Sequence, residues 1–340
     1  MKNYRKLIVL LLLIFFVIFT GAYAYTHIVE KRSLTSNTIE KRSLTSNTIE
    51  KTLPVVNQIK PQTIKEYQNY LTKVAKRNVL PVDIPQALNN EKVEITATDG
   101  MQTFTWNDKN NPKQKVIFYV HGGSYIHQAS ELQYIFVNKL AKKLDAKVVF
   151  PIYPKAPTYN YSDAIPKIKK LYQNTLASVT SHKQIILVGE SAGGGLALGL
   201  ADNLVTEHIK QPKEIILISP WLDIATNNPK IEKVQKKDPL LKAWQLQQVA
   251  PYWANGKKNF KNPQVSPLYS SQFNKMAPIS FFIGTHDIFY PDNQLLHQKL
   301  AKENIKHHYI VGQKMNHVYP VLPIPEAETA FKQMLKIINH

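Results

Sequence analysis

The sequence predicts an α/β fold in which helices flank a mostly parallel central sheet. Three observations indicate it: short apolar runs recur along the chain, helical patterns separate them, and several runs end directly at glycine or proline. Strands of this kind are buried on both faces, as in a parallel sheet that is covered by helices. The chain of 340 residues is also long enough to bury a large core.

The predicted elements alternate over residues 55–340, which we expect to form one folded domain. Six apolar runs are typical of buried strands, at 116–120, 147–151, 184–188, 214–218, 279–283 and 308–311. Helical spacing predicts helices at 64–74, 132–144, 164–176 and 192–205. The segment 222–278 fits this alternation poorly. Together with 55–90 it is expected to form a helical cap near the carboxyl ends of the strands, where such sheets bind ligands.

The first 28 residues predict a membrane segment. Residues 1–6 carry Lys2, Arg5 and Lys6, and an uncharged apolar run follows them. Residues 7–28 are therefore expected to form a transmembrane signal-anchor, with the positive flank in the cytoplasm. A signal peptide that is cleaved near Ala24 is the alternative. Both place the rest of the chain outside the cytoplasm, either held at the cell membrane or secreted.

A tandem repeat follows the apolar segment. The ten residues EKRSLTSNTI at 30–39 recur letter for letter at 40–49. Two short copies do not make a solenoid, which needs at least three units and a shared core. Because the composition is polar, we expect residues 29–54 to form a flexible stalk between the membrane and the folded domain.

The composition excludes several kinds of chemistry. No cysteine is present, so disulfides, thiolate zinc sites and cysteine nucleophiles are excluded. No H-E-x-x-H motif or clustered His/Asp set predicts a metal site. The net charge is +19, but only four of the 43 cationic residues are arginines, and no nucleic-acid-binding motif accompanies the lysines. We expect a lysine-rich surface that anionic surface polymers can attract, and no nucleic-acid partner. The oligomeric state is not predicted.

The segment Gly189-Glu190-Ser191-Ala192-Gly193 is a G-x-S-x-G motif. It comes directly after the apolar strand QIILV and directly before a helical pattern. This is the context of a nucleophile elbow, in which the serine occupies a strained turn and small neighbours allow close approach. The following helix N-terminus also favours a developing negative charge. The pattern therefore predicts Ser191 as a nucleophile, against the alternative of a Gly-rich structural turn.

A second glycine-rich segment, HGGSY at 121–125, also follows an apolar strand. Acyl transfer needs backbone N–H groups that point at the oxygen that becomes negative. Glycines allow that close approach, so the expected oxyanion-hole donors are the N–H groups of Gly122, Gly123 and Ala192.

A serine nucleophile needs a base, and the base needs an acid that orients it. In hydrolases with this elbow the chain order is serine, acid, histidine. Asp287 and His317 each follow a predicted strand in that order, and they are the predicted acid and base. Four competitors are less well placed after their strands: His286, Asp292, His307 and His308.

Taken together, these motifs resemble the hormone-sensitive-lipase branch of the α/β-hydrolase carboxylesterases, from about residue 55 to the end. HGGSY resembles the oxyanion motif HGGG, YPKAP at 153–157 resembles Y-x-L-A-P, and GESAGG resembles GDSAGG. SPW at 219–221, DP at 238–239, SPLY at 266–269 and GTHDIFYPD follow in the expected order. The resemblance implies the α/β-hydrolase fold, a helical cap, no cofactor and hydrolysis of short-chain acyl esters.

The resemblance also implies that four more residues line the substrate site: Ser124, Tyr125, Glu190 and Trp221. Two of them depart from the family pattern. Ser124 replaces the third glycine, which is expected to narrow the acyl pocket or alter the third oxyanion contact. Glu190 replaces an aspartate, which is a conservative change.

The predicted function is hydrolysis of carboxylic esters through an acyl-enzyme. Ser191 attacks the ester carbonyl, His317 takes and returns the proton, and Asp287 orients the imidazole. Two alternatives stay open. An amidase or peptidase would use the same triad, and a cationic cell-surface binding protein would keep the fold without catalysis.

Overall fold

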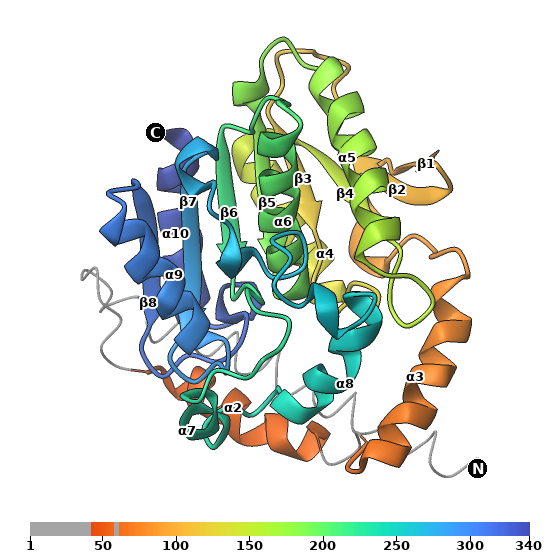
Figure 1. The fold of residues 1–340 in the computed structure, drawn as a ribbon. Coiled ribbons are helices and arrows are strands. Elements are labelled where there is room, and N and C mark those ends of the chain that lie inside the picture. Colours follow the sequence, from red (N-terminus) through yellow and green to blue (C-terminus); the bar gives the residue numbers. More distant parts are fainter. Residues whose placement is uncertain (1–41, 58–60) are drawn as a thin grey trace.

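The computed structural model describes residues 42–57 and 61–340 (Figure 1). Their strands form one sheet with the order β1-β2-β4-β3-β5-β6-β7-β8. The strands are β1 Glu94–Thr98, β2 Met101–Trp106, β3 Val116–Val120, β4 Lys147–Pro151, β5 Ile185–Glu190, β6 Glu214–Ile218, β7 Ile279–Gly284 and β8 His307–Gly312. Neighbours from β4 to β8 pair in parallel, whereas β2 pairs antiparallel with both β1 and β4. The predicted mostly parallel sheet is therefore confirmed.

The antiparallel hairpin of β1 and β2 is absent from the predicted elements. Four of the five β1 residues are exposed, so this strand has no apolar run that would reveal it. Asp99 and Gly100 join the two strands, with φ values of 49° and 77°. An Asp-Gly pair is a typical two-residue hairpin turn. This pair is a local signal in the sequence that indicates the hairpin at this edge.

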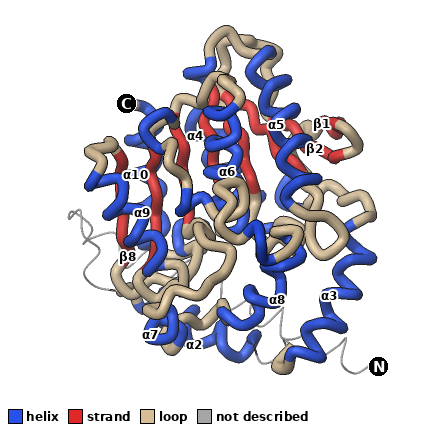
Figure 2. The backbone as a smooth tube through the Cα atoms, viewed as in Figure 1, coloured by secondary structure: helices blue, strands red, loops and turns tan. Residues whose placement is uncertain are grey.

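Helices cover both faces of the sheet (Figure 2). One apolar core includes side chains of α5 Tyr161–Ala177, α6 Ala192–Thr206 and α9 Tyr290–Lys302. The other includes side chains of α4 Glu131–Leu144 and α10 Pro325–Asn339. Ile185 and Leu187 of β5 belong to the first core, and Ile186 and Val188 to the second. Because both faces of β5 are buried in this way, its residues 185–188 form a continuous apolar run.

Four helices lie beyond the carboxyl ends of the parallel strands, in the lower part of Figure 1. They are α2 Leu44–Asn57, α3 Ile64–Asn78, α7 Ile231–Gln235 and α8 Ala243–Trp253. A capping box between Thr63 and Glu66 begins α3. The segment 222–278 holds α7 and α8, and turns and short 3₁₀ segments make up the rest of it.

The structure differs from the expected flexible stalk over residues 44–54, because these residues belong to the helix α2. Ile49 is 9% exposed and joins one apolar core, and Thr45 and Ser46 are buried as well. The polar composition suggested a solvated stalk, but several of these polar side chains bind the folded domain instead.

The predicted membrane segment at 7–28 and the first copy of the repeat at 30–39 lie outside the described residues. Within the described ranges, no helix combines the length and the apolar character that crossing a membrane requires. The membrane location therefore stays a prediction.

Candidate active site

Ser191 occupies the sharp turn between β5 and α6. Its backbone has φ 54° and ψ −122°, a conformation that costs free energy for a residue with a side chain. The flanking glycines permit the turn. A Cβ atom on Gly189 would lie 2.5 Å from the carbonyl oxygen of Gly193, and one on Gly193 would lie 2.1 Å from the carbonyl oxygen of Val120. The strand, turn and helix therefore present the Ser191 side chain at the carboxyl edge of the sheet.

The structure brings Ser191, His317 and Asp287 together in one hydrogen-bonded chain. The Oγ atom of Ser191 lies 2.9 Å from Nε2 of His317, and Nδ1 of His317 lies 2.8 Å from Oδ2 of Asp287. The partners indicate the tautomer, in which Nδ1–H donates to the carboxylate and the Ser191 hydroxyl donates to Nε2. The exposed fractions are 6% for Ser191, 5% for His317 and 0% for Asp287.

Buried carboxylates surround the imidazole of His317. Burial by itself lowers the pKa of His317, but the charges of Asp287, Asp238 and Glu190 and the hydrogen bond to Asp287 raise that pKa above its usual value. A raised pKa makes the imidazole a stronger base and stabilises the imidazolium that forms during proton transfer.

The four competing residues have other partners. His286 lies 3.2 Å from Glu50, and His307 lies 2.8 Å from His297. His308 contacts Ser280 at 3.0 Å, and Asp292 accepts a hydrogen bond from Asn228. None of these contacts involves Ser191.

The predicted oxyanion donors lie in two segments that meet near Ser191. A Cβ atom on Gly122 would lie 3.1 Å from the carbonyl oxygen of Glu190, so this loop is close to the elbow. Gly123 has φ 123°, and a Cβ atom there would lie 2.7 Å from the carbonyl oxygen of His127. Within the described part of the chain, the backbone N–H groups of Gly122, Gly123 and Ala192 have no hydrogen-bond acceptor. They are therefore available to an oxyanion.

Three of the residues that the resemblance places at the substrate site, Tyr125, Glu190 and Trp221, are buried rather than exposed to solvent. Tyr125 and Trp221 are each 1% exposed, and Tyr125 stacks on Trp253 with ring centroids 4.0 Å apart. These rings pack together close to the elbow, where the N–H of Trp221 donates to the carbonyl oxygen of Ser191 at 3.0 Å. Glu190 is also buried, and it accepts hydrogen bonds from Tyr119 and Gln133 rather than facing solvent.

Ser124 takes the place of the third glycine, and its backbone has φ 53°. A left-handed conformation suits glycine better than serine, so Ser124 has some backbone strain. Ser124 is half-buried in the loop that carries Gly122 and Gly123.

Sequence reasoning gave no role to Asp238 or Ser219, although both hold the loops of the triad. Oδ2 of Asp238 accepts the N–H of Ile288 at 2.9 Å, directly after Asp287. Oγ of Ser219 accepts the N–H of Val318 at 2.9 Å, directly after His317. Burial, and then the charge of Asp287, raise the pKa of Asp238 to about 6. The motifs DP and SPW mark these two positions in the sequence.

Comparison with known proteins identifies the family. A family profile described as alpha/beta hydrolase fold matches residues 117–321, which is more than half of the chain. An esterase of Acinetobacter venetianus is 29% identical over 195 residues, which are 57% of this chain and 64% of that protein. A triacylglycerol lipase of Mycobacterium tuberculosis is 28% identical over 208 residues, 61% of this chain and 42% of the lipase. The chain thus spans less than two thirds of either relative.

Solved structures share the fold over most of the chain. A Staphylococcus aureus protein superposes with a TM-score of 0.76 at 25% identity, covering 92% of this chain and 99% of that one. An esterase of the bacterial hormone-sensitive lipase family has a TM-score of 0.73 at 19% identity, covering 88% and 98%. The sheet order, the elbow and the matching profile lead to one conclusion: the chain belongs to the α/β-hydrolase fold family.

Proposed function

We propose that the protein is a serine carboxylesterase of the hormone-sensitive-lipase-like branch. The observation that carries this proposal is the continuous hydrogen-bonded chain from Ser191 through His317 to Asp287. An activated serine beside free backbone N–H donors is suited to acyl transfer. Esterases and lipases among the relatives support the same reaction class.

In the proposed reaction, the Oγ atom of Ser191 attacks the ester carbonyl carbon while Nε2 of His317 takes its proton. Asp287 stabilises the imidazolium, and the N–H groups of Gly122, Gly123 and Ala192 bind the oxyanion. The C–O bond to the alcohol then breaks, and His317 gives its proton to the leaving oxygen. Water attacks the acyl-enzyme in the same way, releases the acid and restores the hydroxyl of Ser191.

We also propose short acyl chains as substrates. Two relatives support this preference by their names, an acetyl-hydrolase of Streptomyces hygroscopicus and an ethyl acetate hydrolase of Pseudomonas putida.

The test is hydrolysis of p-nitrophenyl esters from acetate to palmitate by the full chain and by Ser191→Ala. We expect a maximum rate with short acyl groups and a loss on the order of 10⁴-fold or more in the variant. The fold should survive, since the Ser191 hydroxyl bonds to His317 alone among the described residues. Ser162→Ala, at an exposed serine of α5, is the matched control and should keep the rate.

The matching p-nitroanilide separates esterase from amidase activity. The proposal predicts much slower turnover of the anilide than of the ester. Ester hydrolysis that persists in Ser191→Ala would contradict the assignment, and faster cleavage of the anilide would favour an amidase.

A further inference from the structure

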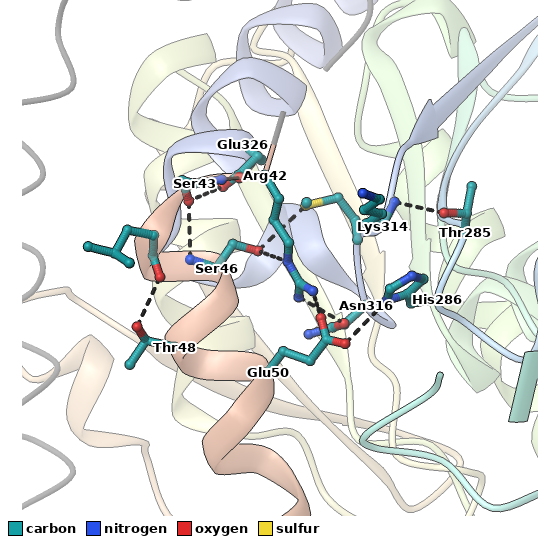
Figure 3. A network of polar contacts seen from close by, with 12 residues as sticks. Arg42, Ser43, Ser46, Thr48, Glu50, Thr285, His286, Lys314, Asn316 and Glu326 are labelled. Carbon is teal, nitrogen blue, oxygen red and sulfur yellow. Dashed lines mark hydrogen bonds and ion pairs between the residues drawn. The ribbon is translucent and has the colours of Figure 1, made fainter. Parts of the chain in front are cut away.

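The helix α2 is fixed at its beginning to the C-terminal part of the domain (Figure 3). Ser43 donates two hydrogen bonds to Glu326, from its N–H at 2.6 Å and from its Oγ at 3.0 Å. Glu326 lies in the first turn of α10 and is 2% exposed. The Oγ atom of Ser46 contacts Sδ of Met315 at 3.8 Å. These contacts bring α2 against the loop that carries His317.

An ion pair between Arg42 and Glu50 lies at the centre of this contact (Figure 3). The Arg42 side chain is only 8% exposed, and its Nε also donates to Ser46 at 3.0 Å. Its Nη2 donates to Oδ1 of Asn316 at 3.3 Å, while Oε1 of Glu50 lies 3.2 Å from Nδ1 of His286. One ion pair therefore contacts both loops of the triad.

The two contacted residues are the direct sequence neighbours of the predicted base and acid. Asn316 precedes His317, and His286 precedes Asp287. A shift of either contact is therefore transmitted through one peptide unit to a triad residue. The loops are also joined to each other, because the N–H of His286 donates to the carbonyl oxygen of Met315 at 3.0 Å.

His286 takes part in this contact as a neutral imidazole. Burial, and then the cations Arg42, Lys237 and Lys314, lower the pKa of His286 to about 4. At neutral pH its Nδ1–H is therefore the donor to the carboxylate of Glu50. The bond holds the acid-bearing loop without adding a positive charge beside Asp287.

A cleft of about 780 Å³ borders the same side of the loops, and Arg42, Glu50, Asp238 and His286 are among its lining residues. Among the described residues, the polar contacts that Arg42 and Glu50 make with the two loops lie along this cleft.

We propose that Arg42 and Glu50 are positioning residues for the triad, which they hold in register through Asn316 and His286. This inference rests on the proposed function. Neither residue touches the reacting atoms. Their effect is to keep Nε2 of His317 aimed at Ser191 and the Asp287 carboxylate aimed at Nδ1, an alignment in which displacements of about 1 Å cost on the order of 10²-fold in rate.

The proposal gives a role to the second copy of the repeat. Residues 30–41 and 40–51 both read EKRSLTSNTIEK, so Arg42, Ser43, Ser46 and Glu50 have identical counterparts ten positions earlier. The first copy lies outside the described residues. An informative experiment must nevertheless remove the guanidinium from both copies, so that a second arginine in the same sequence context cannot replace the first.

The test measures kcat and KM of the full chain for p-nitrophenyl butyrate. Arg32→Ala/Arg42→Ala is expected to lower kcat by roughly 10- to 100-fold with KM within about twofold, because alignment changes and the substrate surface does not. Arg42→Lys in the Arg32→Ala background should recover only part of kcat, since a lysine cannot bridge Glu50 and Asn316 as a guanidinium fork does. Lys51→Ala, an exposed cation of the same helix, is the matched control and should keep kcat.

A second readout is independent of turnover. The low-field proton resonance of the Nδ1–H bond from His317 to Asp287 should shift or broaden in the double variant and stay in place in Lys51→Ala. If the double variant does not fold, Glu40→Gln/Glu50→Gln removes the carboxylate from both copies while it keeps the side-chain shape, and the same two readouts apply to it. Unchanged kcat together with an unchanged resonance in a folded variant would overturn the proposal.

The two hypotheses fail in different ways. If the wild-type chain hydrolyses no ester, or if Ser191→Ala keeps the activity, the proposed function fails. If the activity depends on Ser191 but not on Arg42 or Glu50, only the positioning role fails.

Discussion

Glu190 is a buried carboxylate directly before the nucleophile. It accepts hydrogen bonds from the Tyr119 hydroxyl at 2.8 Å and from Nε2 of Gln133 at 2.9 Å. Burial raises the pKa of Glu190, although both hydrogen bonds and the charge of His317 lower it. The negative charge of Glu190 is in turn one of the causes that raise the pKa of His317. Its expected effect on catalysis is therefore electrostatic.

Glu190→Gln should move the acidic limb of the kcat/KM profile to lower pH. The reaction needs neutral His317, so the rate rises as pH increases through the pKa of His317. Without the nearby negative charge the imidazolium is less stable, so the pKa of His317 falls. Glu328→Gln makes the same change of charge at a side chain of α10 that is 45% exposed, and it should leave the profile in place. A limb that does not move, or that moves to higher pH, would refute this role.

Lys155 is a buried cation next to the oxyanion loop. It is 1% exposed, and its Nζ donates to the carbonyl oxygen of Tyr153 at 2.7 Å. Burial lowers the pKa of Lys155 to about 7. The stretch YPKAP has Lys155 where the pattern Y-x-L-A-P has leucine. The lysine therefore costs stability at a position that suits an apolar side chain.

Lys155→Met should raise the free energy of unfolding by roughly 1–3 kcal/mol at pH 6. The folded pKa is about 7, against a usual value of 10.5, so the cost of the buried charge is complete below pH 7. It decreases as pH rises from 7 towards 10.5, where the unfolded chain also loses the proton. Thermal unfolding at pH 6 and pH 9 should therefore show a smaller gain at pH 9. An exposed control, Lys143→Met, should show no such dependence on pH.

At the scale of elements, close packing of α6 on the end of β3 sets the position of the nucleophile. A Cβ atom on Gly193 would lie 2.1 Å from the carbonyl oxygen of Val120 and 2.3 Å from that of His121. Both obstacles are backbone atoms, which cannot rotate away. The second glycine of the G-x-S-x-G motif is therefore required by the contact between α6 and β3 as well as by the turn at Ser191.

Gly193→Ala should destabilise the fold by about 3 kcal/mol or more, because helix and strand must separate. Gly100→Ala is the comparison. That residue has φ +77° and nothing within 4 Å of its Cβ position, so we expect a loss of only about 1 kcal/mol from backbone strain. Urea unfolding of both variants gives the two values. Equal losses in the two variants would contradict the steric explanation of the cost at Gly193.

The elements differ in how far the sequence predicts them. β3, β4 and β6 match the predicted bounds, because a strand buried on both faces is a continuous apolar run. β1 lacks that signal because one edge of the sheet faces solvent. α2 escapes prediction for another reason: its stabilising partners, Glu326 and Asn316, lie more than 270 positions away along the chain. Local composition carries no information about such contacts.

At the scale of the whole molecule, two segments far apart in sequence build the surface beyond the sheet. Tyr67 of α3 meets Trp244 of α8 edge to face, with ring centroids 5.6 Å apart. Nε2 of Gln245 donates to the carbonyl oxygen of Pro61 at 2.9 Å. α3 and α8 are therefore expected to respond together to a change in either one.

Trp244→Ala should speed hydrogen exchange in α3 while exchange in the central sheet stays unchanged. The aromatic pair contributes roughly 1 kcal/mol beyond the area it buries, which corresponds to about fivefold faster exchange or more. Mass spectrometry of peptides from α3 and from β5 gives the comparison. Equal acceleration of hydrogen exchange in the α3 and β5 peptides would mean that α3 and α8 unfold only together with the whole domain.

The sequence predicts the triad residues of the candidate site, but it does not predict the residues that support them. Ser191, Asp287 and His317 follow strands in a fixed order, and the structure places them within hydrogen-bond distance. The triad loops are also held by contacts from Asp238, Ser219, Arg42 and Glu50. These contacts form between segments that are distant in the sequence, so local patterns do not reveal them. The packing of Tyr125 and Trp221 likewise depends on Trp253, which lies in the poorly alternating segment.

The most direct test of the central claim is to locate the covalent adduct of a p-nitrophenyl alkylphosphonate on the full chain. The phosphorus centre imitates the tetrahedral intermediate, and an activated serine displaces p-nitrophenolate from it. We expect one equivalent of p-nitrophenolate and a phosphonate on the peptide that contains Ser191, with no adduct in Ser191→Ala. Labelling at another residue, or no labelling of the folded wild-type chain, would contradict it.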